Sequence, residues 1–471
     1  MLFIVLRKIL NNKGLIAALL VGSILAVAMI SAIPMYTNAI LQRMLVKDFE
    51  SYQENNNEYP GRYVLEANIM SHATPSKRMQ NFEYYSPCKI VFGKGAENQV
   101  AKELLCYGAK RVLLVFGGGS VRKSGLLQRM EENLDAAGIA HASFGGAKPN
   151  PVVSHAREGV QKARSFQSDF ILAVGGGSAI DTAKAIAHGA ANPETDIWEF
   201  WLKKVPLTRS LPVGAVLTIP AAGSETSDSA VLTNEETGEK RGLSTDFNVP
   251  KLAFMDPELT FTLSDFQVTC GITDILMHTL DRYFTHTKNN ELTDAIAEAV
   301  LRTAFKNGAI AAKDHHNYEA MSELMWCGSI SHNRMTGLGA QTDFSTHKLG
   351  HELSARFDVA HGASLSAVWG SWAKAVYREE PERFACYGER VWGIQKSTPE
   401  EAAVAAIDAT VAYFQRIHAP VCFTELGIGV QTDETLHALA HACTSKTGGK
   451  TGFFKRLSEE DVYEIYRAAN H

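Results

Sequence analysis

The chain has 471 residues, 45% of them hydrophobic and 21% charged, which is the balance of a globular protein with room for two or three domains. Its net charge of −5 and the lack of a basic block after the first fifty residues argue against nucleic acid as a partner. The seven cysteines are scattered and form no C-x-x-C pair, so we expect buried thiols in a reducing compartment, with no disulfides and no zinc ribbon.

The opening of the chain is apolar. Residues 14–42 carry no charged side chain, and the stretch 14–34 has about the length that a helix needs to cross a bilayer. This stretch is longer than an ordinary signal-peptide core, and no clean cleavage site follows it. We therefore expect a membrane helix, with a buried soluble helix as the alternative. Residues 54–78 are polar and rich in turn formers, which is typical of a linker.

Strand and helix patterns alternate after this linker. Apolar runs at 89–92, 111–116, 171–174 and 215–219 predict strands, and continuous apolar runs are typical of strands buried on both faces. The pattern at 179–188 predicts a helix. This alternation predicts a Rossmann-like α/β domain with a mainly parallel sheet covered by helices on both faces.

Two of these strands end in a G-G-G-S loop. Glycines directly after a strand let the backbone approach a pyrophosphate, and the following helix offers unpaired N–H groups and a positive dipole end. One such loop can be a simple turn, but two copies at strand ends favour a dinucleotide site. The candidate cofactor-binding residues in these loops are Gly117, Gly118, Gly119, Ser120, Gly176, Gly177, Ser178 and Asp181.

Charges near the first loop indicate which dinucleotide binds. Arg122 and Lys123 follow Ser120, and a serine beside two cations would accept the 2′-phosphate of NADP(H), which an acidic residue would repel. We therefore favour NADP(H) and count Lys123 among the contacts; the alternative is that both cations are ordinary surface residues. Asp181 leaves another alternative open, because it could orient its loop or simply be an acidic residue favoured by the helix dipole.

The second half of the chain is predicted to be helical. Periodic segments such as 292–311 and 399–417 predict helices, and Ser264 with Gln267 three residues later predicts a capping box. We place a domain boundary near residue 262. The expected parts are a membrane helix with linker, a dinucleotide-binding α/β domain and a helical metal-binding domain, at residues 1–78, 79–262 and 263–471.

Two short runs in this helical half hold one aspartate and four histidines. Asp274 and His278 are four residues apart, as are His347 and His351, so each pair shares one helix face. His361 stands in an A-H-G sequence, where a ligand could sit at a helix end. Each pair alone is usually a solvated helix face, but together they offer the carboxylate and imidazoles that bind a divalent transition metal. We expect them to meet in the cleft between the two halves.

Seven motifs stand in the order and spacing of a known family: FGKGA, FGGGSVRKSG, LAVGGGSAIDTAK, LTIPAAGSE, DPELTFTL, TDILMHTLDRY and THKLGHEL…AHG. Through them residues 79–471 resemble the iron-containing (group III) alcohol dehydrogenases, in particular the NADPH-dependent butanol dehydrogenases and broad-range aldehyde reductases. The resemblance implies one metal, Fe(II) or Zn(II), and leaves His351 unligated beside the substrate. The implied metal ligands are Asp274, His278, His347 and His361.

The resemblance also implies an activity, hydride transfer between NADP(H) and an aldehyde or alcohol, with the metal as Lewis acid. His351 is the candidate proton relay, since an imidazole titrates near neutral pH, and solvent is the alternative. Ala222 departs from the threonine of many relatives. A homodimer or larger assembly is implied, and a glycerol dehydrogenase or dehydroquinate-synthase-like activity is the alternative. The further implied cofactor contacts are Thr218, Ser224 and Lys240.

The amino-terminal segment has a different resemblance. Through the sequence I-P-M-Y-x-N-A-I, residues 1–70 are similar to the start of an FtsX-like ABC-transporter permease, so a membrane permease fragment is the non-enzymatic alternative. The excess of positive residues before the helix favours an internal amino terminus, which would export an enzyme that uses a cytosolic cofactor. The helix could insert the other way or be unused, or the chain could join two reading frames. We favour the fusion, with an enzyme starting at Met79, a cytoplasmic catalytic region and anchoring through residues 14–34 as an option.

Overall fold

The computed structural model describes residues 78–471. The membrane helix expected at 14–34 and the permease-like opening lie outside the described residues and stay predictions. Among residues 78–471, no helix is both long enough and apolar enough to cross a membrane.

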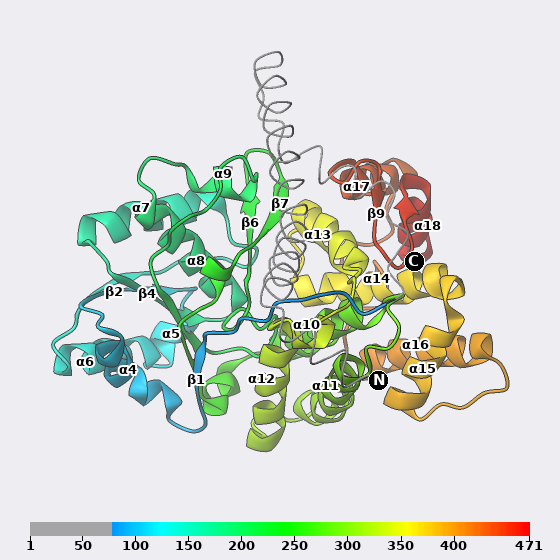
Figure 1. Ribbon diagram of the computed structural model, residues 1–471, viewed down its shortest axis with the longest axis horizontal. Coiled ribbons are helices and arrows are strands. Elements are labelled where there is room, and N and C mark those ends of the chain that lie inside the picture. The colour runs from blue at the N-terminus through cyan, green and yellow to red at the C-terminus, as the bar shows by residue number, and fades with distance from the viewer. Residues whose placement is uncertain (1–77) are drawn as a thin grey trace, which may run out of the picture. The chain divides into compact units, whose positions relative to one another are not determined.

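A six-stranded parallel sheet forms the first half of the described chain (Figure 1). The order of its strands is β1-β8-β5-β4-β2-β3, and every pair runs parallel. The predicted α/β class is therefore confirmed, and the central strands are apolar because both of their faces are buried. The strands are β1 (Lys89–Phe92), β2 (Arg111–Phe116), β3 (Ala140–Phe144), β4 (Phe170–Gly175), β5 (Val213–Leu217) and β8 (Leu252–Met255).

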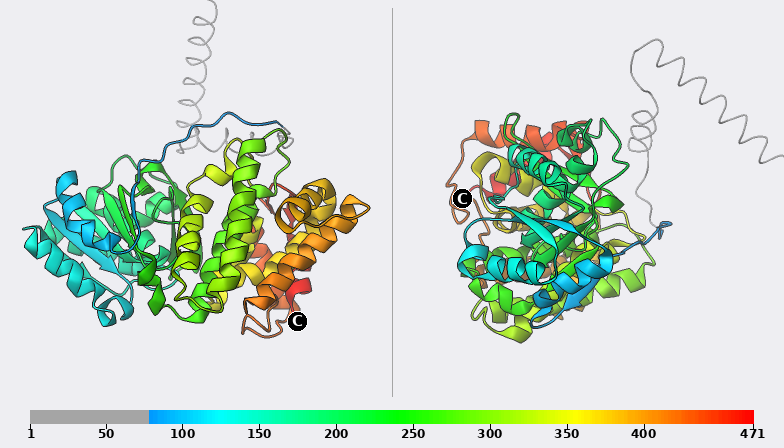
Figure 2. Two further views of the ribbon diagram at one scale, coloured as in Figure 1. Left: turned by 90° about the horizontal axis from the view of Figure 1, so that it is seen from below. Right: turned by 90° about the vertical axis from the view of Figure 1, so that its left-hand side faces the viewer.

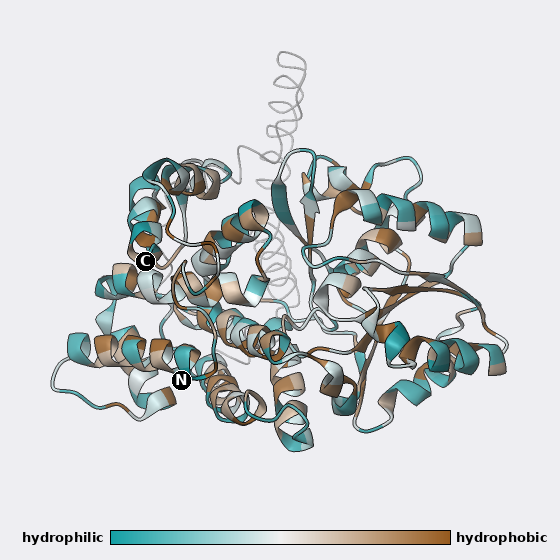
Figure 3. Ribbon diagram, turned by 180° about the vertical axis from the view of Figure 1, so that it is seen from behind, coloured by the Kyte–Doolittle hydropathy of each residue, from teal (hydrophilic) through white to brown (hydrophobic). Residues whose placement is uncertain are grey.

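Helices cover both faces of this sheet, as predicted. On β2, alternate side chains point to opposite faces: Val112 and Leu114 join one hydrophobic cluster, and Leu113 and Val115 join another. The first cluster includes residues of α4 (Val100–Tyr107) and α6 (Leu126–Ala136), and the second includes residues of α7 (Val153–Phe166) and α8 (Gly177–Ala191). The ribbons of the strands are accordingly apolar along their length (Figure 3).

A separate antiparallel hairpin consists of β6 (Ser229–Asn234) and β7 (Glu239–Ser244). This hairpin was not predicted, although buried and part-exposed residues alternate along β6 as expected for a strand. The strand β7 contacts helix α13 (Ser345–Phe357) of the second half. The hairpin therefore links the sheet half to the helical half, which lie side by side in Figure 2.

The second half is mostly helical, as predicted, but it is not all-α: β9 (Lys450–Thr451) and β10 (Leu457–Ser458) form a short antiparallel pair. Its first long helix, α10 (Asp265–Tyr283), opens with the predicted capping box between Ser264 and Gln267. Most of α10 is buried, and the helices around it share one large hydrophobic core that includes Trp369 and Trp372. The other long helices are α11 (Glu291–Ala311), α12 (Tyr318–His332), α13, α14 (His361–Val376), α15 (Pro381–Trp392), α16 (Pro399–Arg416), α17 (Asp433–Ser445) and α18 (Glu459–Ala469).

The cysteines correct one expectation. All seven are free, but they are not all buried thiols. Cys106 is exposed because it lies on the outer face of α4, whose opposite face packs on the sheet through Val100 and Leu104. A scattered cysteine on an amphipathic helix is therefore buried only when it falls on the apolar stripe.

Candidate active site

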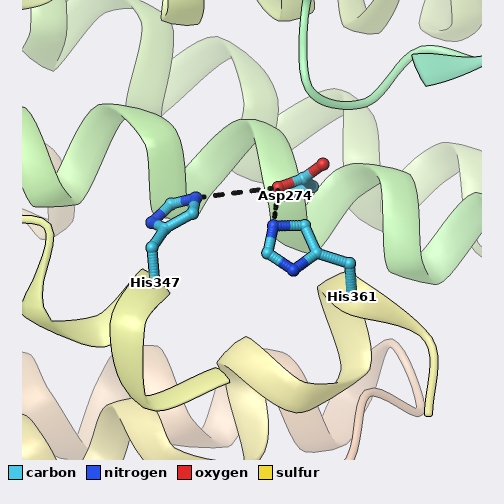
Figure 4. Close-up of side chains that lie close together, drawn as sticks. All are labelled: Asp274, His347 and His361. Atoms are coloured by element: carbon cyan, nitrogen blue, oxygen red, sulfur yellow. Dashed lines mark ion pairs between the residues drawn. The ribbon is translucent and has the colours of Figure 1, made fainter. Parts of the chain in front are cut away.

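Three helices bring Asp274, His347 and His361 to one point (Figure 4). Asp274 lies in the middle of α10, His347 in the first turns of α13, and His361 is the first residue of α14. One side-chain atom from each lies within 4.8 Å of the others. The Nε2 atoms of His361 and His347 are 3.7 and 4.0 Å from Oδ1 of Asp274. These three candidate ligands therefore surround a common centre.

His278 adds a third imidazole to this centre. It follows Asp274 by one turn of α10, and its Nε2 lies 3.5 Å from the same Oδ1 atom. Its ring stacks on His332 with a centroid distance of 4.0 Å, and Arg282 Nη1 lies 3.3 Å from its Nδ1. His332 and Arg282 were not among the candidate residues. His332 lies far from the other residues in sequence, whereas Arg282 follows His278 by one turn of α10 and could have been found from that spacing.

Three buried atoms of these candidate ligands have no hydrogen-bond partner in the described part of the chain: Asp274 Oδ1, His347 Nε2 and His361 Nδ1. Buried polar atoms are normally paired, so an unpaired carboxylate oxygen facing an unpaired imidazole nitrogen is the arrangement expected where a cation binds. One carboxylate and three imidazoles form a donor set that suits Fe(II) or Zn(II). The residues therefore fit the divalent metal that the sequence resemblance implies.

Burial controls the protonation of these groups. Desolvation raises the pKa of Asp274 to about 6, although the neighbouring His347 and Lys240 lower it. Burial also holds the pKa values of His278, His351 and His361 well below the usual 6.5. The expectation that His351 titrates near neutral pH is therefore wrong, because desolvation and the nearby positive charge of Lys240 both lower its pKa. Neutral imidazole is the form that binds metals.

A second carboxylate supports His347 from behind. Asp281 Oδ2 lies 2.6 Å from His347 Nδ1 and also accepts a hydrogen bond from the backbone N–H of His347 at 3.2 Å. A proton on Nδ1 leaves the lone pair of Nε2 facing Asp274, as in other metal sites with a carboxylate behind the histidine. Asp281 was not among the predicted site residues, although it lies two turns after Asp274 on the same face of α10.

The predicted nucleotide loops lie side by side in the other half. They follow β2, β4 and β5, which are neighbours in the parallel sheet, so their carboxyl ends share one edge. The chain proceeds from β2 to β3 on one side and then crosses to β4 on the other side. Open α/β sheets bind ligands at such a reversal of strand order. The loops 117–120 and 175–178 flank this point.

The second glycine loop is tightly held. Gly177 and Ser178 form the first turn of α8, and Gly176 is its N-cap. The backbone N–H of Thr218, after β5, donates to the carbonyl oxygen of Gly175 at 3.1 Å. A Cβ atom at Gly176 would lie 2.1 Å from Ile219 Cγ2, so the loop requires glycine at this position. The backbone here is free to approach a phosphate because no side chain intervenes.

The first glycine loop is open. The carbonyl oxygen of Gly117 accepts a backbone hydrogen bond at 3.0 Å, but Gly118, Gly119 and Ser120 are exposed. Ser120 begins the one-turn helix α5 (Ser120–Lys123), and Lys123 is exposed as well. This loop therefore offers side chains to a ligand without fixing them beforehand.

Asp181 and Lys184 connect α8 to the third loop of this edge, residues 218–228 between β5 and β6. Asp181 accepts hydrogen bonds from Ser224 Oγ at 2.6 Å and from the backbone N–H of Val231 at 2.9 Å. Lys184 is fully buried and donates to Ser224 Oγ at 3.0 Å and to the backbone carbonyl oxygens of Ser227 and Ser229. Asp181 lies beyond the first turn of α8, which disfavours the dipole alternative, and its bonds tie it to the loop after β5 and to β6, not to its own glycine loop. Lys184 was missed because its partners lie about 40 residues further along the chain.

Lys240, on β7, lies near both the candidate ligand Asp274 and Asp181 of α8. Its Nζ donates to Asn150 Oδ1 at 2.9 Å, and its side chain is buried. Burial lowers its pKa to about 8, although the carboxylates of Asp274 and Asp181 act in the opposite direction. One lysine therefore interacts electrostatically with both the metal centre and the α8 loop.

Comparisons with known proteins agree with this arrangement. The family described as "Iron-containing alcohol dehydrogenase" matches residues 87–257, and "Fe-containing alcohol dehydrogenase family, C-terminal" matches residues 268–470. The chain is 37% identical to NADH-dependent butanol dehydrogenase A of Clostridium acetobutylicum, over 83% of this chain and 99% of that protein. It is 35% identical to the NADPH-dependent aldehyde reductase YqhD of Escherichia coli, over 74% and 90%.

Solved structures give the same result. NADH-dependent butanol dehydrogenase A of Thermotoga maritima superposes with a TM-score of 0.80 at 34% identity, over 84% of this chain and all of that one. The YqhD structure of E. coli gives 0.79 at 32% identity with the same coverage. The chain therefore belongs to the iron-containing alcohol dehydrogenase family. Within that family it is an alcohol or aldehyde oxidoreductase related to butanol dehydrogenases and YqhD, and membership implies a divalent metal and an NAD(P) nucleotide.

Proposed function

We propose that residues 79–471 form an NADP(H)-linked aldehyde reductase and alcohol dehydrogenase of the butanol dehydrogenase type. The observation that carries this proposal is the convergence of three imidazoles on the unpaired Oδ1 of Asp274. In this proposal a dinucleotide-binding domain at 79–262 and a metal-binding domain at 263–471 share one site. The proposed metal ligands are Asp274, His278, His347 and His361.

Different residues of the chain would bind the metal and the dinucleotide. When bound, Fe(II) or Zn(II) would supply Lewis-acid polarisation of a carbonyl oxygen, and the reduced dinucleotide would supply the hydride. The loops 117–120 and 175–178 would hold the pyrophosphate at the switch point of the sheet. Thr218, Ser224 and Lys240 would line the path between these loops and the metal. In this proposal the burial of Asp274, His278 and His347 helps to exclude water from the reacting atoms.

A proton must reach the product oxygen after hydride transfer, and we assign its delivery to His351. This residue lies one helical turn beyond His347 on α13, and its ring centroid is 5.2 Å from that of His361. A neutral imidazole carries one proton and can donate it through one ring nitrogen while the other accepts a replacement. His351 is partly exposed, so the replacement can come from solvent.

The preference for NADP(H) is the finer part of the proposal. Ser120 and Lys123 are exposed at the edge of the open loop, and the guanidinium of Arg122 lies 5.1 Å from the ring centroid of Phe116. No acidic side chain stands between residues 117 and 130 to repel a 2′-phosphate. NAD(H) is the second candidate, because two of the relatives named above are NADH-dependent and one is NADPH-dependent.

Oxidation of NADPH by butanal tests the proposal. The full chain is assayed as purified, after chelation, and after refilling with Fe(II) or Zn(II) separately. We expect chelation to remove activity and one of the two metals to restore it, with NADPH used better than NADH. Activity that persists without metal would refute the metal role. Membrane fractionation of the full chain beside a version starting at Met79 tests the anchoring, and the mass of the shorter version in solution tests the expected dimer.

A further inference from the structure

Two consecutive residues near the end of α10 face two different candidate ligands. Asp281 lies against Nδ1 of His347, and Arg282 lies against Nδ1 of His278. Both side chains are buried, Asp281 fully and Arg282 to all but 7%. Neighbouring positions on a helix point about 100° apart, which is how one turn of α10 reaches both histidines. His347 therefore has a negatively charged neighbour, and His278 has a positively charged one.

Asp281 favours the form of His347 that can bind a metal. Its carboxylate can only accept a hydrogen bond, so the proton of the neutral imidazole is held on Nδ1. The lone pair then lies on Nε2, the buried and unpaired atom that faces Asp274. A carboxylate behind a ligating histidine fixes the ring and strengthens it as a ligand.

Arg282 has the opposite effect on His278. A guanidinium has no acceptor atom and keeps its protons, so it can only donate toward Nδ1. That contact favours the proton on Nε2 of His278, the nitrogen that faces the metal centre. For Nε2 to bind a metal, the ring proton must move to Nδ1, where it points at the N–H groups of Arg282.

The charge of Arg282 is not neutralised locally. Its Nη1 donates to the carbonyl oxygen of His278 at 2.6 Å, and its guanidinium lies 4.7 Å from the ring centroid of Phe344. No carboxylate among residues 78–471 lies within ion-pair distance of it, and Asp228, a carboxylate nearby, is already paired with Arg334. The charge of Arg282 is offset only by the more distant carboxylates of Asp228 and Asp281, and it also acts on His278.

We propose that Asp281 and Arg282 are positioning residues that make the two histidines unequal: His347 is the firmly held ligand and His278 is the weaker one, which releases first. The Nε2 atom of His278 lies 3.5 Å from Oδ1 of Asp274, no farther than the nitrogens of His347 and His361, so the difference is one of tautomer and charge and not of distance. The inference rests on the proposed function, because it concerns the metal of the same site.

The test measures metal affinity directly, with Co(II) as the probe and a chelator as competitor. The full chain is compared with four variants: Asp281→Leu, Asp281→Asn, Arg282→Met and Arg282→Lys. Glu298→Gln is the matched control, since Glu298 is also a buried carboxylate that accepts a hydrogen bond from a residue of α10, Tyr283, at 3.0 Å. Thermal unfolding of each variant reports folding, and the visible absorption of Co(II) reports the coordination.

We expect Asp281→Leu to weaken Co(II) binding roughly 10- to 100-fold, the usual effect of losing such a supporting group. Asp281→Asn keeps an acceptor oxygen and should lose less. Arg282→Met should bind Co(II) at least as tightly as the wild type, while Arg282→Lys and the control should match it. Unchanged affinity in Asp281→Leu, or a similar loss in Arg282→Met, would overturn the inference.

The same experiment separates this inference from the proposed function. A wild-type chain that binds no Co(II), Fe(II) or Zn(II) would end the proposed function as well. A wild-type chain that binds one metal ion and loses it equally in the Asp281 and Arg282 variants would end only the inference. A shift of the Co(II) spectrum in Asp281→Leu without loss of folding would support a role in coordination, because a merely structural residue would leave the spectrum of the bound ion unchanged.

Discussion

The candidate metal centre and the first glycine loop are built in opposite ways. The proposed ligand side chains are largely buried, and His347 is held from behind by Asp281. The loop 117–120 is largely exposed, and Ser120 starts a helix of a single turn. A preorganised group loses much when one member is removed, whereas an open loop can change its selectivity at little cost to the fold. The expected effects of mutation follow that difference.

Replacement of His347 by alanine has the largest expected effect. It removes a ligand together with the hydrogen bond to Asp281, so metal retention and NADPH-dependent turnover should be lost together, by more than the roughly 100-fold effect of a supporting residue. Elemental analysis and the butanal assay measure both. His278→Ala should retain more metal than His347→Ala. A His347→Ala protein that is fully loaded with metal and yet inactive would contradict its role as a ligand.

A buried histidine outside the centre sharpens the comparison. His188, on α8, is fully buried, and both ring nitrogens are hydrogen-bonded, to Ser210 Oγ and Asn248 Oδ1, each at 2.8 Å. It is therefore a satisfied core residue, whereas Nε2 of His347 has no hydrogen-bond partner in residues 78–471. Burial alone does not identify a ligand; an unpaired nitrogen aimed at a carboxylate does.

The same residue gives a prediction on acid stability. Burial lowers the pKa of His188 to about 4 from the usual 6.5, so between these values the unfolded chain binds a proton that the folded chain does not. Stability should therefore fall as the pH drops from 6.5 to 4, by about 3 kcal/mol for this group. Chemical unfolding at pH 7 and pH 4 should show a smaller drop in His188→Gln than in the wild type. An equal drop in both proteins would contradict the assignment.

His351→Ala tests the boundary between ligand and relay within the metal centre. The ring of His351 lies 6.3 Å from that of His347, and no hydrogen bond to it is found in the described residues. We expect the variant to keep its metal and to lose roughly a hundredfold in turnover, which is typical for a group that transfers a proton. Metal content and kcat are measured on the same preparation. Loss of the metal would mean that ligand and relay have been exchanged.

Local patterns predicted much of this molecule. The apolar run 111–116 became β2 with the expected bounds, and the capping box at Ser264 formed as predicted, because both depend on neighbours in the sequence. The spacing of Asp274 and His278 required only that a helix form around them. Asp281 was missed because its partner is distant in sequence: it meets His347 66 positions later. Arg282 was missed although it lies one turn after His278 on the same helix. Only folding the chain shows which buried groups meet.

The smallest expected effect belongs to the open loop. Ser120→Asp places a carboxylate where we expect the 2′-phosphate of NADPH, and like charges should weaken NADPH binding while an adenosine ribose gains an acceptor. The ratio of kcat/KM for NADPH over NADH should fall about tenfold, equivalent to about 1.4 kcal/mol. Because Ser120 is exposed, metal content and thermal stability should not change. Lys123→Gln should shift the ratio in the same direction by less, since it removes one attraction and adds no repulsion. An unchanged ratio in both variants would place the adenosine end of the cofactor away from this loop, and the second glycine loop would then have to carry the phosphate contacts.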